Sequence, residues 1–212
     1  MKKNRGMKLV NLIKEHIKNN AKEYIIVTLI FITGIFAGVF FLNNMQETPK
    51  SDVTNYLNNF ITKLKENQNL DMIGLFKNSI MQNLILGVVI WFFGTTVIGI
   101  PIVFGLVLYR GFCLGYTIST TILVLGLTKG LNFSIVALLI QNILFIPAIL
   151  ALAVSGFKLY KSIIKDKRKE NIKLEILRHT IFSLIMLILL IISAIIEIFI
   201  STNILCKIIK YF

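Results

Sequence analysis

Charged residues are scarce in this sequence, and their scarcity excludes a soluble protein. Only 16% of the 212 residues are charged, whereas 56% are hydrophobic and the mean hydropathy is +0.79. A soluble domain of this size has too little interior to hide so much apolar side chain, so most of it must face lipid. In lipid every backbone polar group must be paired within the chain, and the alternating pattern of a membrane barrel is absent. The sequence therefore predicts an all-α, polytopic membrane protein.

Cysteine, histidine and catalytic motifs are equally scarce. The two cysteines, Cys113 and Cys206, lie in or beside apolar segments without CxxC spacing, which excludes a disulfide or metal framework. The two histidines, His16 and His179, lie in basic segments, and no HExxH, GxSxG or phosphate-binding glycine loop occurs. A catalytic site needs a nucleophile with a base, a carboxylate pair or metal ligands within mutual reach. The sequence therefore predicts a protein that is not an enzyme and holds no cofactor or metal.

Long apolar segments are abundant, and they predict a bundle of five transmembrane helices. About 20 apolar residues in a helix cross a hydrocarbon core of about 30 Å. The predicted spans are residues 24–42, two crossings within the apolar block 80–127, about 133–155 and about 181–201, so that spans two to five occupy residues 80–201. The turn between spans two and three is predicted either at Gly99–Pro101, because proline disrupts a helix interior, or at Tyr109–Gly111.

Positive charge is concentrated beside two of these spans. Residues 1–23 contain seven Lys or Arg and two acidic residues, and residues 157–179 contain eight and three. The positive-inside bias puts both segments in the cytoplasm, which five spans allow with the N-terminus inside and the C-terminal tail, residues 202–212, outside. Residues 43–79 then form an extracytoplasmic loop. The net charge of +13 is thereby assigned to contact with membrane lipids and not with nucleic acid.

Arg110 is the one charged residue between Asn78 and Thr128. Both predicted turns put it near the cytoplasmic face, where its long side chain could reach the headgroups as an anchor. The alternatives are a buried charge that holds a partner helix or lipid headgroup, and a charge used in ion transport. Glu197 is predicted near the outer face, because it follows His179 by 18 residues. An Arg110–Glu197 ion pair is therefore not expected.

The external loop contains an amphipathic stripe at helical spacing. Its apolar members are Val53, Tyr56, Leu57, Phe60, Ile61 and Leu64. A second apolar set, residues 70–76, runs directly into the second span. One interpretation is a pair of helices that lie on the outer leaflet. The other is a docking site for an extracytoplasmic partner, made by Tyr56, Leu57, Phe60, Ile61 and Leu64.

The spans also carry residues suited to contact between helices. Gly34 and Gly38 form one GxxxG motif, and Gly111 and Gly115 form another; small residues at this spacing let helix backbones approach closely. The fourth span has the amides of Gln141 and Asn142, which can hydrogen-bond between helices, and Pro147, which frees a backbone carbonyl. These residues are predicted to form contacts inside the bundle or with a partner.

Two segments together resemble the stage II sporulation protein M family. They are GIPIVFGLVLYRGFCLGYT, residues 99–117, and IQNILFIPAIL, residues 140–150. In that family a polar or basic residue precedes Gly-Phe or Gly-Leu, another glycine follows, and an asparagine-to-proline segment comes later. The basic leader, the external loop and the five spans fit as well, so the resemblance covers nearly the whole chain. The matching residues are Arg110, Gly111, Phe112, Gly115, Asn142 and Pro147, although the wider family often has asparagine where Arg110 stands.

The resemblance implies a mother-cell protein of the septal and engulfing membrane, needed for engulfment of the forespore. It also implies a scaffold that holds two peptidoglycan-degrading partners, the stage II sporulation proteins D and P. The alternative from another class is a small membrane transporter or lipid-handling protein with a polar pathway near Gln141 and Asn142. A continuous polar cavity past Asn142 would favour the alternative, and a tightly packed bundle with an exposed apolar external loop would favour the scaffold.

Overall fold

The computed structural model describes residues 17–65, 72–165 and 172–201, and all the regular structure there is helical. The elements are α2 (Ala21–Asn43), α3 (Glu47–Lys65), α4 (Met72–Gly94), α5 (Ile100–Leu125), α6 (Leu127–Ser134), η1 (Ile135–Leu139), α7 (Ile140–Lys165), α8 (Ile172–Ile196) and η2 (Glu197–Ser201). The two η elements are π-helical turns continuous with their neighbours. Most of the leader 1–23 and the tail 202–212 lie outside the described residues.

Five of the described helices are long and apolar enough to cross a membrane. They are α2, α4, α5, most of α7, and α8 with the start of η2. Large apolar side chains project from their outer sides, and Phe36 and Phe40 are each 70% exposed. Such exposure suits lipid and not water. The prediction of an all-α bundle with five transmembrane helices is confirmed, whereas the orientation of the termini stays a prediction.

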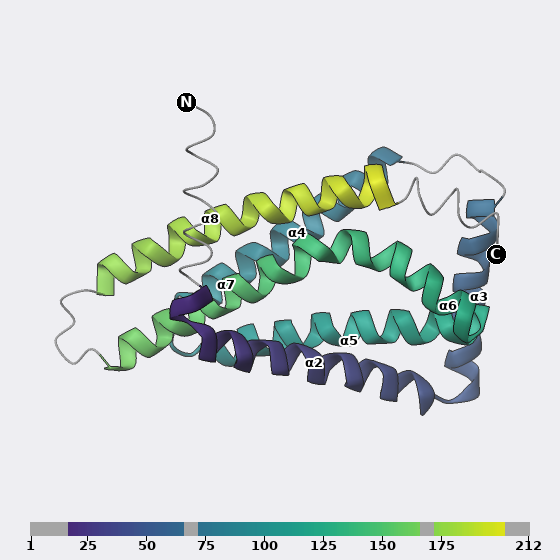
Figure 1. The fold of residues 1–212 in the computed structure, drawn as a ribbon, viewed down its shortest axis with the longest axis horizontal. Helices are drawn as coiled ribbons and strands as arrows, with labels where there is room; N and C mark the ends of the chain where they lie inside the picture. The colour runs from purple at the N-terminus through teal and green to yellow at the C-terminus, as the bar shows by residue number, and fades with distance from the viewer. Residues whose placement is uncertain (1–16, 66–71, 166–171, 202–212) are drawn as a thin grey trace.

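Helix α7 is the centre of the bundle. In the apolar stretch of α7 that could cross the membrane, 61% of the residues are buried, against 17% to 33% in the corresponding stretches of the other four helices. Figure 1 shows α2 running beside α5 and α4 running beside α8, and α7 packs against all four of these helices. Its side chains Leu152, Ala153 and Val154 are fully buried, together with Val103 of α5 and Leu190 of α8.

The two ends of the bundle differ in the segments that lie there. The basic end holds the start of α2, the α4–α5 turn, the end of α7 and the start of α8 (Figure 1). The opposite end, the α3 end, is crossed by α3, which lies nearly perpendicular to the bundle (Figure 1). At the basic end Lys161 Nζ of α7 bonds Glu23 Oε1 of α2 at 2.8 Å.

The apolar block turns at residues 95–99, between α4 and α5. Pro101 is the second residue of α5, where a missing N–H breaks no helical hydrogen bond. Gly99 is required there, since a Cβ atom would overlap the carbonyl oxygen of Phe93. Of the two predicted turns, the one at Gly99–Pro101 agrees with the structure, since Gly99 ends the turn and α5 begins at Ile100. The alternative at Tyr109–Gly111 is wrong, because those residues lie inside α5.

Three predicted boundaries differ from the structure. Helix α4 begins at Met72, so the second apolar set of the external loop is its first turns and not a second surface helix. The fourth span lies at 142–164 and not at 133–155, because residues 127–139 form α6 and η1. Helix α8 begins at Ile172, which leaves a connection of residues 166–171 where a basic loop of 157–179 was predicted.

Candidate functional site

Two reciprocal GxxxG motifs form the contact between α2 and α5. A Cβ atom added at Gly34 or Gly38 would overlap a backbone carbonyl oxygen of α5, and one added at Gly111 or Gly115 would overlap one of α2. Both helices run from the basic end to the α3 end, so this is a parallel pair (Figure 1). Small residues on both sides bring the two backbones into direct contact, which supplies dispersion energy where lipid offers no hydrophobic driving force.

Aromatic rings extend this contact toward the α3 end. The Phe112 ring lies edge-on to Phe41 of α2, with centroids 5.5 Å apart, and stacks on Tyr116 at 6.1 Å. Pairs of this geometry contribute about 0.5–1.5 kcal/mol beyond the area that they bury. Phe112 is thus placed inside the α2–α5 contact.

Arg110 lies deep in the bundle. It is ten residues beyond Ile100, which puts its Cα about 15 Å from the start of α5 at 1.5 Å per residue. Phe104 of α5 packs against Phe157 of α7, with ring centroids 5.1 Å apart. Counted from that pair, Arg110 lies about 9 Å and Phe145 about 18 Å nearer the α3 end. A side chain that joins these two residues must point away from the basic end.

The guanidinium of Arg110 makes that contact. Its Cζ lies 4.1 Å from the centroid of the Phe145 ring. Its Nε is buried and has no hydrogen-bond partner among the described residues. It also lines a small cavity of about 120 Å³ with Thr117, which is two turns nearer the α3 end. The interpretation of Arg110 as an anchor at the cytoplasmic headgroups is therefore wrong, because the charge turns into the bundle.

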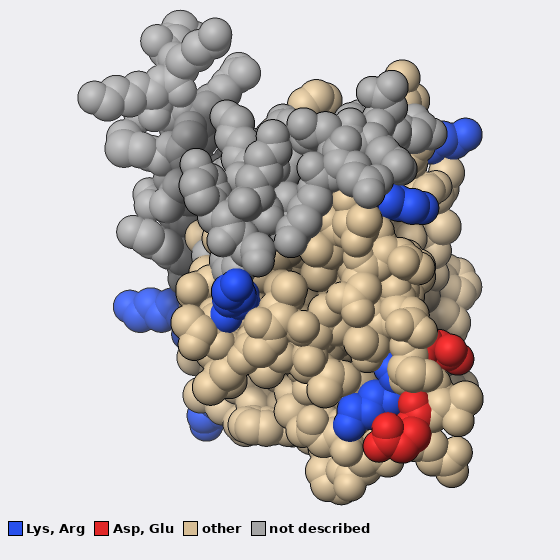
Figure 2. All heavy atoms as spheres, turned by 90° about the vertical axis from the view of Figure 1, so that its right-hand side faces the viewer, with Lys and Arg blue, Asp and Glu red and all other residues tan. Residues whose placement is uncertain are grey.

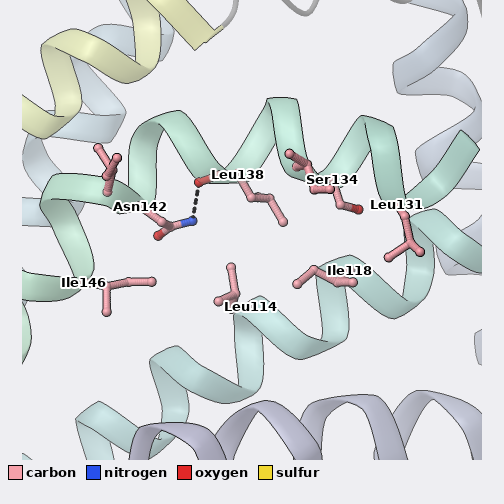
Figure 3. A pocket seen from close by; sticks show the side chains of 9 residues that line it. Leu114, Ile118, Leu131, Ser134, Leu138, Asn142 and Ile146 are labelled. Atoms are coloured by element: carbon pink, nitrogen blue, oxygen red, sulfur yellow. Dashed lines mark hydrogen bonds between the residues drawn. The ribbon is translucent and has the colours of Figure 1, made fainter. Parts of the chain in front are cut away.

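A larger cavity adjoins Arg110, between α5 and the α6–η1–α7 segment (Figure 3). Its volume is about 340 Å³, and Leu114, Leu138, Asn142 and Ile146 line both cavities. The remaining lining residues are Ile118, Leu131, Ser134, Ile135 and Ile143. Figure 3 shows Leu114 and Ile118 of α5 facing Leu138 and Ile146 across the space. The polar residues on its wall are Ser134 and Asn142, so this cavity is not a polar pathway.

Asn142 does not hold two helices together. Its Nδ2 donates a hydrogen bond to the Leu138 carbonyl, one turn back in the same helix, at 2.8 Å (Figure 3). The side chain of Gln141 lies outside the described residues. Pro147 is inside α7, one turn beyond Ile143, whose carbonyl it leaves without the usual helical donor. The predicted interhelical role of Asn142 thus differs from what the structure shows.

The residues predicted for docking in the external loop divide between two faces of α3. Ile61 is buried and Leu57 is half-buried, and α3 packs against α5. Tyr56 is 77% exposed and Phe60 is 40% exposed. The side chain of Leu64 lies outside the described residues. Figure 2 views the α3 end, where most of the surface that is not grey is uncharged and basic and acidic side chains lie together at the lower right.

A buried polar cluster near the basic end was missed by the sequence analysis. His179 is 3% exposed, and its Nδ1 lies 2.9 Å from Ser155 Oγ of α7, while its Nε2 lies 3.4 Å from the Trp91 carbonyl of α4. The ring fits because Gly94 leaves room, where a Cβ atom would be 3.1 Å from Nε2. Three helices meet at this histidine. The Ser183 hydroxyl, one turn after His179, donates a hydrogen bond to the His179 carbonyl.

Glu197 lies near the α3 end, at the start of η2. The Ser79 hydroxyl of α4 donates a hydrogen bond to its carboxylate. The ion pairs between described residues are Lys161–Glu23 and Arg178–Glu175, so Arg110 and Glu197 do not form a direct pair.

Comparison with known proteins identifies a family for nearly all of this bundle. Residues 27–202 match the family model described as Stage II sporulation protein M. The match runs from the first turns of α2 to the residue after η2, and so includes both GxxxG motifs, Arg110 and the cavity. Comparisons with curated proteins and with solved structures gave no match.

Proposed function

Because the chain belongs to the stage II sporulation protein M family, we propose that it is a non-enzymatic scaffold of the engulfment machinery. In this role it holds the peptidoglycan-degrading stage II sporulation proteins D and P at the septal membrane of the mother cell. The family and the five apolar helices make the chain a multi-pass membrane protein of sporulation. The scaffold role and its partners rest on that family and on the surface of α3.

The proposed orientation puts the basic end in the cytoplasm. The segments 1–23 and 157–179 carry fifteen of the 23 basic residues and lead into or out of this end. The positive-inside bias and the anionic inner leaflet both favour that side for them. The α3 end then faces the compartment that contains the cell wall, where hydrolases of peptidoglycan work.

The observation that carries the proposal is the placement of α3. It lies across the outer end of the bundle (Figure 1), held by the buried Ile61, and leaves Tyr56 and Phe60 exposed. Tyrosine and other aromatic residues are enriched where partners bind, because they supply large rigid contact areas. The transporter alternative needs a polar pathway near Asn142, and the cavity there is lined almost wholly by apolar side chains.

The experiment that tests the scaffold uses α3 and partner recovery. The tagged protein is purified from membranes of sporulating cells, and recovery of the two hydrolases is compared between variants. We expect Tyr56→Asp with Phe60→Asp to lower recovery at least tenfold and to block engulfment, at an unchanged level of the protein. Asn59→Asp with Thr62→Asp is the matched control, since both residues are exposed on the same helix. Normal recovery and engulfment with the aromatic pair replaced would refute the proposed docking surface.

A further inference from the structure

The cavity between α5 and the α6–η1–α7 segment has the form of a ligand site inside the membrane. Its two parts, of about 340 and 120 Å³, share Leu114, Leu138 and Ile146 on their walls. Small-molecule pockets are typically about 300–1,000 Å³ and mostly apolar, with a few polar groups that fix orientation. The large part is apolar, and the small part ends at the guanidinium of Arg110. A ligand that matches these walls would have one charged end and one long apolar part, and so would be an amphiphile.

Arg110 supplies the recognition of an anion. A buried guanidinium is costly unless an anion or hydrogen-bond acceptor compensates it. Here it rests on the Phe145 ring, and its Nε lacks a hydrogen-bond partner among the described residues. Asn142 lines the same space and uses one amide N–H on the Leu138 carbonyl, which leaves a second one for a ligand. The planar guanidinium fits a carboxylate with two parallel hydrogen bonds.

The size of the cavity decides between the possible occupants. A phospholipid would bring two chains and a bulky phosphate headgroup to the smaller part, about 120 Å³. A single chain with a small charged end fits both parts.

We propose that this cavity binds one long-chain carboxylate, a free fatty acid, with its carboxylate at Arg110 and Asn142 and its chain between Leu114, Ile118 and Leu138. This inference does not depend on the scaffold role. The chain lies toward the α3 end, along the wall that includes Ile135 and Leu138 of η1. Single π-helical turns within α-helices often occur at functional sites.

The test is a binding measurement on the full-length protein in detergent, with tritiated palmitate as the probe. We expect saturable binding of one palmitate per chain. Unlabelled palmitate should compete at least tenfold better than methyl palmitate, because the ester keeps the chain but loses the charged hydrogen bonds, and a 1.4 kcal/mol difference is tenfold. Equal competition by the ester, or better competition by dioleoylphosphatidylglycerol, would overturn the proposal. These competition measurements use only the wild-type protein, so a variant that fails to fold cannot affect their result.

Two variants with matched controls locate the site. Arg110→Met should weaken binding of palmitate tenfold to a hundredfold and abolish the preference over the ester, whereas Lys129→Met, at an exposed cation of α6, should not. Ile118→Trp should remove binding by filling the cavity, whereas Ile102→Trp, on the lipid side of the same helix, should not. Wild-type affinity in Ile118→Trp would refute the site. A photoreactive residue at position 118 that cross-links to a second polypeptide in native membranes would assign the groove to a partner protein instead.

Discussion

At the scale of single residues, the direction of a side chain determines its role. Arg110 was expected to reach the nearer membrane surface, and instead its guanidinium lies on Phe145 in the opposite direction. His179 was assigned to a loop, and instead it links α4, α7 and α8. In both cases a polar group in an apolar bundle is directed to a specific site, because an unsatisfied polar group in hydrocarbon costs several kcal/mol, of order 2–7.

Replacement of Arg110 by lysine tests the stacked geometry. Lysine keeps the charge but has no planar group to lie on Phe145, and a desolvated cation–π contact contributes about 0.5–2 kcal/mol. We expect Arg110→Lys to lower the thermal midpoint in detergent by about 2–4 °C for each kcal/mol lost. Lys173→Arg, an exchange at an exposed cation of α8, is the control and should leave the midpoint unchanged. An unchanged midpoint in Arg110→Lys would mean that the stacking of the guanidinium on Phe145 adds no measurable stability.

Removal of the His179 ring should destabilise the meeting point of three helices. His179→Ala leaves a void and removes the 2.9 Å partner of Ser155 Oγ, whereas the Trp91 carbonyl keeps the hydrogen bond that the Thr95 N–H donates. We expect a loss of about 2–4 kcal/mol. Trp91 is the single tryptophan of the chain, so its fluorescence reports unfolding at this site. Arg178→Ala is the neighbouring control, because its exposed pair with Glu175 contributes about 0–1 kcal/mol; a similar loss in both variants would contradict the proposed role of the ring.

At the scale of elements, the pairing of helices depends on where the small residues lie. Helices α2 and α5 are separated by α3 and α4 in the chain, yet their backbones come into direct contact at their four glycines. The motifs are visible in the sequence, but each could have faced lipid or any other helix. The pairing follows from reciprocal shape, since both glycine stripes face the same partner.

Two glycines on α5 provide a matched test of this contact. A methyl group at Gly115 would overlap the Ile35 carbonyl oxygen, whereas one at Gly105 would have nothing within 4 Å. We expect Gly115→Ala to destabilise the protein by about 1–3 kcal/mol, as overpacking does, and Gly105→Ala to be neutral or slightly stabilising. Thermal unfolding in detergent measures both. Gly126 is no suitable control, because its φ of +79° disfavours any side chain. Equal stability of the two variants would mean that α2 and α5 are not held together by close packing.

At the scale of the whole molecule, five helices and two unlike ends define an oriented membrane protein. The basic end carries the Lys161–Glu23 pair between α7 and α2, and the other end is crossed by α3. Orientation decides which end meets the cell wall, and therefore whether α3 can serve as a docking surface at all.

Labelling of single cysteines tests this orientation. In a background with both native cysteines replaced by alanine, Asp52→Cys on α3 should react with a membrane-impermeant maleimide in intact cells. Lys173→Cys on α8 should react only after the membrane is made permeable, because the basic end is predicted to be cytoplasmic. Both positions are exposed on their helices. Labelling of the two positions under the same conditions would refute an odd number of spans between them.

The sequence by itself determined the class of the protein, the number of spans and the amphipathic character of α3. These properties depend on local composition, because lipid as a solvent requires about 20 apolar residues in each span wherever the helix lies. The tertiary structure alone decided that α5 begins after residue 99, that α2 pairs with α5, that Arg110 turns toward Phe145, and that a cavity lies beside it. Lipid tails and neighbouring helices are equally apolar, so hydropathy cannot tell which face of a helix meets which. In a membrane that choice is made by shape and by the few polar groups that must find partners.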